Sequence, residues 1–246
     1  AVQAGYMLVG KTVTIPANTD LMAFTVTATS VVDDTKTTSV TFHASTTESK
    51  AVAFTTEVGM EYTDRTSSVD LSSLNLGTFA GARMKDGTAL NGVTYEGGSL
   101  KLGGANFDGN LWGNQTVIAT FESVNDGVVE KVTDVEIPVL LVTKYIETLT
   151  DLQSIQSYAK FVSSDTLGGY FVQTADINAD GAKVQFGMVD TSNGGWTIKD
   201  KFAGVYDGRN HCIDNMYAEH YGGFFTTIAT NGMVKNLVFT NAKLGT

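Results

Sequence analysis

The stretch Thr148-Leu149-Thr150-Asp151-Leu152-Gln153-Ser154-Ile155 separates two different patterns in this sequence of 246 residues. Thr148 and Asp151 have the spacing of a capping box at a helix N-terminus, with Asp in place of the usual Glu. Apolar residues recur at the spacing of one helical face, at Leu149, Leu152, Ile155 and Ala159. We therefore expect one amphipathic helix here, between strands that precede it and strands that follow it.

Before this stretch, apolar and polar residues alternate, as they do in strands that bury only one face. The first alternating apolar positions are Val13 and Ile15, then Phe24, Val26 and Ala28, then Val40, Phe42 and Ala44. Polar turns at 17–20 and 33–34 separate these segments at the spacing of a β-sandwich. We expect an immunoglobulin-like sandwich over residues 1–66.

A second region of alternation follows the polar stretch 63–68 and ends in an apolar run from Val135 to Leu141. Turns that contain Gly interrupt it at 86–87, 91–92, 97–98, 108–110 and 125–127. Residues 67–145 fit a second immunoglobulin-like sandwich. Because each module would be close to the smallest size that supports its own core, one larger sandwich is an alternative.

After the helix the sequence is rich in Gly, Asn and aromatic residues, and one segment repeats. Residues 213–218 (Ile-Asp-Asn-Met-Tyr-Ala) align with residues 234–239 (Val-Lys-Asn-Leu-Val-Phe), which follow 21 positions later. A period of this length is typical of a solenoid. We expect residues 146–246 to form a capping helix and the first coils of a right-handed β-helix.

In such a β-helix the repeat would stack equivalent residues of successive coils. The alignment predicts Asn215 above Asn236 and Ile213 above Val234. The helix is placed to cover one end of the coils, but nothing in the sequence is placed to cover the other end. We therefore expect further coils after Thr246.

Several blocks between residues 143 and 241 carry a resemblance to a known family. In order they are Thr143-Lys144-Tyr145-Ile146-Glu147-Thr148 with the helix 149–155, Gly169-Tyr170-Phe171-Val172 running to Asp176-Ile177, Phe202 to Gly208 with His211 and Ile213, Gly222-Gly223-Phe224-Phe225, and Val234-Lys235-Asn236-Leu237. This succession resembles the start of the β-helical region in bacterial surface proteins that carry the GLUG motif. At the motif itself, Phe224-Phe225-Thr226 stands where the family usually has Leu-Phe-Gly.

The resemblance implies an extracellular or cell-surface bacterial protein of the adhesin type, with no defined chemistry for the motif. We expect a non-catalytic protein whose sandwiches act as spacers and whose β-helix presents a face to a host or matrix surface, with glycan as a candidate ligand. The alternatives are the N-terminal part of a β-helical polysaccharide-degrading enzyme and a component of a phage fibre or spike.

Composition excludes several other classes. The formal net charge is −10 and the only arginines are Arg65, Arg83 and Arg209, which argues against binding a nucleic acid. The single cysteine, Cys212, can form neither an intramolecular disulfide nor a cysteine-rich metal site. No apolar run reaches the ~18 residues of a membrane span, so we expect no membrane insertion.

Asp176, Asn178 and Asp180 are the candidate metal ligands. With Gly181 they reproduce the first half of a calcium loop, in which alternate oxygens converge on the ion. The twelfth position of such a loop should supply a bidentate carboxylate, but here it is Gly187. We therefore favour a polar turn over a Ca²⁺ site, and we expect no cofactor.

The remaining candidate positions are aromatic residues or short polar clusters. Tyr206, Tyr217 and Tyr221 are the candidates for ligand binding, because an exposed aromatic ring can stack on a sugar. We interpret Asp207-Gly208 as a turn and Cys212 as a packing residue. Neither paired carboxylates nor a Ser/His/Asp arrangement with a nucleophile elbow is present, so we expect no catalytic residues.

Overall fold

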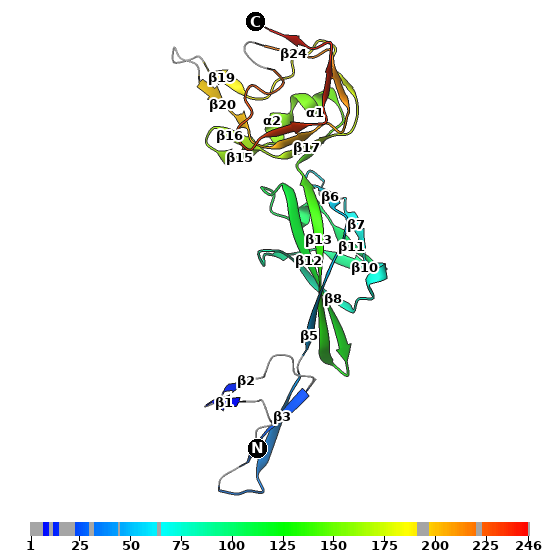
Figure 1. The fold of residues 1–246 in the computed structure, drawn as a ribbon, viewed down its shortest axis with the longest axis vertical. Coiled ribbons are helices and arrows are strands. Elements are labelled where there is room, and N and C mark those ends of the chain that lie inside the picture. Colours follow the sequence, from blue (N-terminus) through cyan, green and yellow to red (C-terminus); the bar gives the residue numbers. More distant parts are fainter. Residues whose placement is uncertain are drawn as a thin grey trace.

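The computed structural model describes residues 7–9, 12–14, 23–29, 32–43, 45–62, 65–190, 197–219 and 223–245. Over these residues the chain consists mostly of strands with two short helices, which confirms the predicted all-β class. N-terminal strand pairs, a sheet region (residues 45–142) and a coil region (residues 143–245) follow one another along an elongated molecule (Figure 1).

The N-terminal strands form two antiparallel pairs. One pair is β1 (Met7–Val9) with β2 (Thr12–Thr14), and the other is β3 (Ala23–Thr29) with β4 (Thr37–His43). Across the second pair, Thr25 and Thr41 share a hydrogen bond of 2.9 Å between their Oγ1 atoms. Much of the sandwich expected for residues 1–66 lies outside the described residues.

The sheet region contains two sheets around one core. The larger sheet has the order β5-β13-β12-β8-β9 with β6 also paired to β13, and the smaller has the order β10-β11-β7. The strands are β5 (Thr46–Ala51), β6 (Thr56–Gly59), β7 (Ser67–Asp70), β8 (Thr78–Met84), β9 (Ala89–Leu90), β10 (Thr94–Glu96), β11 (Ser99–Leu102), β12 (Gly113–Asn125) and β13 (Val128–Val142), with the 3-10 helices η1 (Ser72–Leu74) and η2 (Gly104–Asn106). Val69 and Leu100 of the smaller sheet and Val117, Phe121 and Ile137 of the larger one are fully buried in a single apolar cluster.

Strand pairing crosses the boundary that the sequence suggested near residue 67. β5 and β6 precede that boundary, yet both pair in parallel with β13, and Val58 is buried in the same core as Val139. The polar residues around 63–68 therefore connect two strands of one module. Strands from both sides of the predicted boundary therefore share one core, to which Val52 and Val58 contribute from the N-terminal side.

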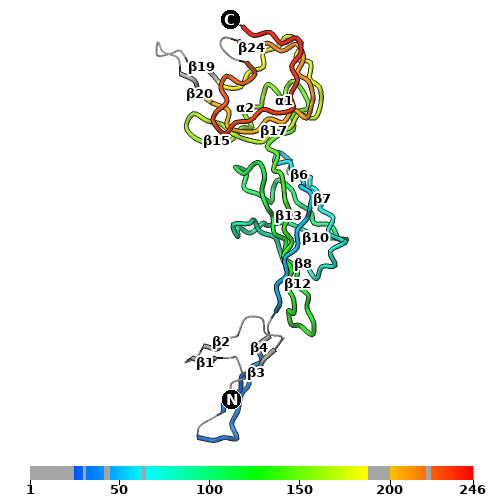
Figure 2. Tube along the Cα trace, in the orientation of Figure 1, coloured from blue at the N-terminus to red at the C-terminus, as the bar shows by residue number. Residues whose placement is uncertain are grey.

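The coil region is built from short parallel strands that stack from one turn of the chain to the next (Figure 2). The parallel sheets are β14-β17-β22-β25, β18-β23-β26, β16-β21 and β24-β27. Their strands are β14 (Lys144–Ile146), β16 (Thr166–Gly168), β17 (Tyr170–Gln173), β18 (Ile177–Asn178), β21 (Lys201–Phe202), β22 (Val205–Asp207), β23 (Cys212–Asp214), β24 (Tyr217–Ala218), β25 (Met233–Lys235), β26 (Val238–Thr240) and β27 (Lys243–Leu244). Two antiparallel pairs also occur, β15 (Lys160–Ser163) with β16 and β19 (Met188–Asp190) with β20 (Thr197–Lys199).

The observed register corrects the predicted period of 21 residues. Ile213 pairs with Phe239, and Val234 pairs with Tyr206, so Ile213 and Val234 do not stack on each other. Asn215 follows β23 and Asn236 follows β25, and both have a positive φ. The prediction was wrong because the alignment matched the corner after β23 with the corner after β25, and these two strands belong to different parallel sheets.

Two short helices replace the predicted single one. α1 (Leu149–Gln153) and α2 (Ile155–Tyr158) meet at Ser154, which has a non-helical ψ of 1°. The predicted capping box at Thr148 and Asp151 is confirmed by reciprocal hydrogen bonds. Leu152 and Ile155 are buried in the apolar cluster of the coils, so the helices cover the first coil.

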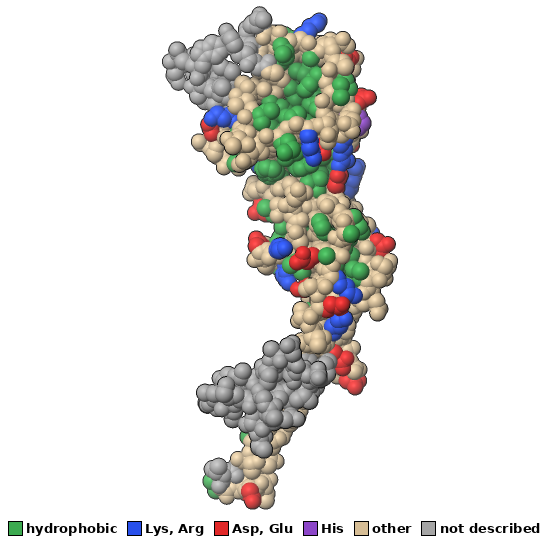
Figure 3. Space-filling model, viewed as in Figure 1, with side chains coloured by type: hydrophobic (Ala, Val, Ile, Leu, Met, Phe, Trp, Pro, Cys, Tyr) green, Lys and Arg blue, Asp and Glu red, His purple; other side chains and the backbone are tan. Residues whose placement is uncertain are grey.

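The last coil carries several exposed apolar side chains. They are Ile228, Met233, Val238, Phe239 and Leu244, each at least 43% exposed. Figure 3 shows a broad hydrophobic area over this part of the molecule. None of the helices in the described part of the chain has the length and apolar character that a bilayer crossing requires.

We predict that Gly208→Ala destabilises the stack of coils. A Cβ at Gly208 would lie 2.5 Å from the carbonyl oxygen of Asn236 and 2.8 Å from Cα of Leu237 in the next coil. Since these are backbone atoms, the coils must separate, and we expect a loss of about 1–3 kcal/mol in the free energy of unfolding. Gly109→Ala is the matched control, because its Cβ would meet nothing within 4 Å. Equal urea midpoints for the two variants would contradict the stacking described here.

Candidate functional site

The coil region joins the sheet region through a single continuous segment. β13 ends at Val142 and β14 begins at Lys144, so only Thr143 lies between the two strands. Thr143 is buried, its N–H donates to the carbonyl of Tyr170 at 2.8 Å, and its Oγ1 accepts from the N–H of Tyr170 at 2.9 Å. This residue therefore fixes the end of the sheet region to β17.

An apolar cluster surrounds this connection. Val142, Tyr170 and Val172 are buried in it, with Val142 from the sheet region and the other two from the coil region. Partly buried residues pack against them from both regions: Trp112, Leu140, Tyr145 and Val205. The two regions thus share a small core of their own, in addition to their separate ones.

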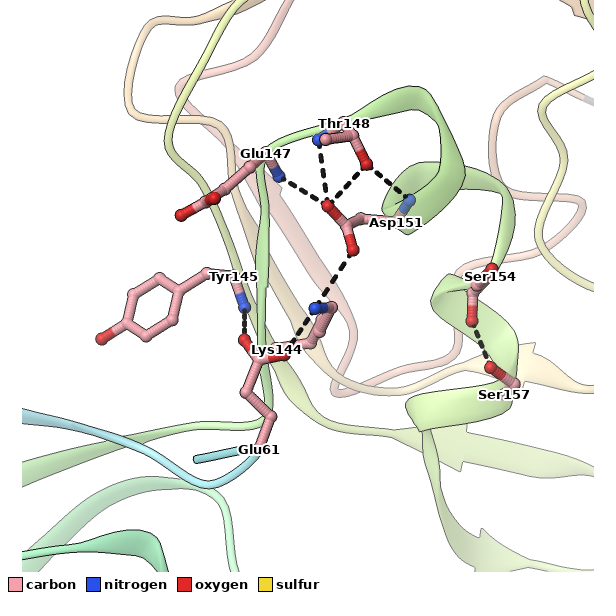
Figure 4. Close-up of polar contacts among 8 residues, drawn as sticks. All are labelled: Glu61, Lys144, Tyr145, Glu147, Thr148, Asp151, Ser154 and Ser157. Atoms are coloured by element: carbon pink, nitrogen blue, oxygen red, sulfur yellow. Dashed lines mark hydrogen bonds and ion pairs between the residues drawn. The ribbon is translucent and has the colours of Figure 1, made fainter. Parts of the chain in front are cut away.

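Lys144 lies at the centre of the polar contacts at this junction (Figure 4). Its ammonium contacts the carboxylate of Glu61, which follows β6, and lies 3.1 Å from Oδ1 of Asp151 in α1. Glu61 also accepts a hydrogen bond of 3.0 Å from the backbone N–H of Tyr145. The ammonium lies 5.1 Å from the ring centre of Tyr158. One side chain therefore connects the sheet region, the linking strand and the helices.

The charges at this junction stabilise one another. Burial alone would lower the pKa of Lys144, but the hydrogen bonds to Glu61 and Asp151 outweigh burial and raise its pKa. For Asp151 burial acts to raise the pKa, and the contacts with Thr148 and Lys144 overcome it, so the net shift of the pKa is downward. At neutral pH the ammonium has no lone pair to act as a nucleophile or base. We therefore assign Lys144 a structural role.

A second set of contacts lies beside the first. Glu57 of β6 contacts Arg209 of the coil region, and it accepts a hydrogen bond of 3.4 Å from the hydroxyl of Tyr145. Burial and the nearby charge of Glu57 raise the pKa of Tyr145 to about 12. The rings of Tyr62 and Tyr145 stack with centroids 6.1 Å apart, and Arg65 lies over Tyr62. These contacts give the junction a second point of attachment.

The candidate calcium ligands take part in turns and in contacts between coils. Oδ1 of Asp176 accepts from the backbone N–H of Cys212 at 2.8 Å and lies 3.2 Å from Nδ1 of His211. Oδ1 of Asn178 accepts from the N–H of Asp180 at 2.8 Å, and Asp180 has a positive φ of 50°. In the described residues, no three Asp, Glu, His or Cys side chains are arranged to hold a metal ion. Our preference for a polar turn over a Ca²⁺ site at these residues stays a prediction.

Tyr206, a candidate for stacking on a ligand, is a core residue. Its side chain is fully buried, and its hydroxyl donates a 3.0 Å hydrogen bond to Oε1 of Gln173. A ring with no exposed face cannot stack on a sugar, which corrects that assignment. Tyr217 is half-buried in β24, and Tyr221 lies outside the described residues.

Asp207 and Cys212 have structural surroundings. Asp207 is buried, and its carboxylate lies 3.0 Å from the ammonium of Lys235 and accepts a 3.0 Å hydrogen bond from Asn236. Cys212 is half-buried with Sγ 3.1 Å from Oγ1 of Thr240 in the next coil. Both residues join successive coils. These contacts agree with our interpretation of a turn after Asp207 and of packing at Cys212.

The junction residues were not singled out by the sequence. Lys144 and Tyr145 belong to a block that supported the family resemblance, but nothing local connects them with Glu61, which is 83 positions away from Lys144. The order of charged residues along the sequence does not show which of them will form an ion pair over such a distance. No family model, curated protein or solved structure matches this chain.

We predict that Lys144→Met lowers the free energy of unfolding by about 1–3 kcal/mol. The variant keeps the apolar stem but leaves the carboxylates of Glu61 and Asp151 close together without a cation. Lys183→Met is the matched control, because the ion pair of Lys183 with Glu219 is about half exposed and contributes at most about 1 kcal/mol. An equal effect of the two substitutions on the denaturant midpoint would show that the junction is not stabilised by Lys144.

A pH dependence should follow from Asp151. Its pKa in the folded chain is below the ordinary 3.8, so its contribution to stability is full above that value and is lost as the pH falls through the folded pKa. We expect Asp151→Asn to be less stable than the parent at pH 7, and the difference to shrink below about pH 3. Thermal unfolding at a series of pH values measures it. Asp126→Asn, at an exposed turn with positive φ, should parallel the parent throughout, and a constant gap for Asp151→Asn would oppose the assignment.

Proposed function

We propose that this chain is a non-catalytic, extracellular or cell-surface bacterial protein of the adhesin type. In this proposal the sheet region is an immunoglobulin-like spacer. The coil region is the start of a right-handed β-helix of the GLUG type that presents a face to a ligand on a host or matrix surface. The ligand that we favour is a glycan.

Two features of the fold support this proposal. Two sheets that enclose one core are what an immunoglobulin-like spacer requires. Parallel strands that pair from coil to coil, with a helical cap over the first coil, are what the start of a β-helix requires. The family assignment itself still depends on the sequence resemblance.

The observation that carries the proposal is the junction between the two regions. Thr143, the shared apolar cluster and Lys144 connect the coil region to the sheet region at several points. A fixed junction lets a spacer hold the binding region at a defined distance and orientation. The strand pair β3–β4 and the last coil lie at opposite ends of the elongated molecule, as a spacer requires (Figure 1).

The proposal is tested by exposing the purified chain to arrays of glycans and matrix proteins and to soluble polysaccharides in parallel. We expect retention on the array and no change in the chain length of any polysaccharide. The denatured chain is the control for nonspecific adsorption. Polysaccharide cleavage by the chain would contradict the proposal. The absence of binding to any component of the arrays would also contradict it.

A further inference from the structure

A surface hollow in the coil region lies apart from the junction contacts. It is bounded by the helices α1 and α2 on one side and by the strands β15 and β16 on the other, with Asp200 at its edge. Its apolar part is formed by Phe161 and Leu167, and its polar part includes Gln153, Gln156 and Asp200. The hollow therefore combines an apolar surface with amide and carboxylate groups.

Phe161 is the most informative residue in this hollow. It pairs across the strands with Leu167, so the two side chains are on the same face of the hairpin. Leu167 is buried, whereas Phe161 is 84% exposed. Burying a Phe side chain is worth about 1.5–3 kcal/mol, and this fold leaves that gain unused. The ring is therefore available to a ligand.

The amides beside the ring are held in position. Nε2 of Gln156 donates to Oδ2 of Asp200 at 2.8 Å, and its Oε1 accepts from the N–H of Gly187 at 3.1 Å. Nε2 of Gln153 donates to the carbonyl of Lys183 at 3.1 Å. In the described residues, Oε1 of Gln153 and Oδ1 of Asp200 accept no hydrogen bond. The hollow thus offers two oriented acceptors next to an exposed ring.

We propose that this hollow binds a neutral saccharide ring. The C–H face of the sugar would stack on Phe161, and its hydroxyl groups would donate to Asp200 and Gln153. Among the described residues that line the hollow, Asp200 is the only charged one, and the chain carries a net charge of −10, so an anionic sugar would be repelled. The inference rests on the proposed function and assigns its glycan to one site.

A peptide strand is a less suitable ligand for this surface. β15 is four residues long, and its pairing with β16 shifts register between Phe161 and Ser163. Such an irregularity interrupts the row of backbone groups that an added strand would need. The stacking ring and the side-chain acceptors favour a hydroxyl-rich ring instead.

Saturation-transfer NMR and calorimetry with neutral trisaccharides of glucose, galactose and mannose test the proposal. We expect transfer to the ring C–H protons of at least one of these sugars, and little to a sialylated trisaccharide. Phe161→Ala should weaken binding about tenfold, whereas Phe161→Trp should retain it. Asp200→Asn should weaken binding about fivefold, since Asn tolerates the positive φ of 59° but is a neutral acceptor.

Val162→Ala is the matched control, because Val162 is exposed in the same strand but does not line the hollow. It should bind as the parent does. All variants change exposed or half-exposed side chains, and unchanged circular dichroism and unfolding midpoints confirm that each is folded.

The other possible outcomes would contradict the assignment of a saccharide site to this hollow. Sugar binding that survives Phe161→Ala would assign the glycan to another surface and leave the proposed function intact. Absence of transfer to all three trisaccharides would reject the hollow, while retention on matrix proteins would still support the adhesin role. Binding of an extended proline-rich peptide in place of every sugar, lost in Phe161→Ala, would replace a saccharide by a peptide at this surface.

Discussion

The arrangement of the molecule depends on how the positive charge of Lys144 is compensated at the boundary between the sheet and coil regions. Its side chain is only 13% exposed, and a charge removed from water is tolerated only when partners replace the lost hydration. Glu61 supplies one partner from the sheet region, and Asp151 supplies the other from the helices. Since both carboxylates must reach one ammonium, the first coil and its helical cover have a defined position against the sheets.

Within the coil region the same requirement to satisfy buried polar groups selects the stacking. Gln173 is fully buried, and its side chain accepts from Tyr206 and donates to the carbonyl of Cys212 in the next coil. The corners that follow the strands place Asn215 and Asn236 in the left-handed region, which Asn adopts at little cost. Tight approaches at glycines such as Gly208 then set the spacing between coils. The hollow beside Phe161 lies between the two helices and the β15–β16 hairpin, where the fold leaves Phe161 exposed.

Local features were predicted well from the sequence and long-range pairings were not. The capping box at Thr148 depends on residues three apart, and alternation in strands is also local, so both were visible. The parallel pairing of β5 with β13 joins residues that are far apart in the sequence, and no local pattern near residue 67 indicates it. The period was misread because the corners at Asn215 and Asn236 look alike in the sequence but follow strands of different sheets. Tyr206 was misassigned because its burial depends on contacts with neighbouring coils, which the sequence does not show. Phe161 was missed because the sequence also does not show where such contacts are absent and leave a ring exposed.

The most direct test of this account is the distance between spin labels on the sheet and coil regions. Labels at Lys85→Cys and Lys183→Cys, both at exposed positions, in a chain with Cys212→Ser, report on the junction. If Thr143, the shared apolar cluster and Lys144 hold the two regions in one relative orientation, double electron–electron resonance will give one narrow distribution of distances between the labels. A broad or multiple distribution in the folded chain would contradict a fixed junction, and with it the proposal that the sheet region acts as a rigid spacer.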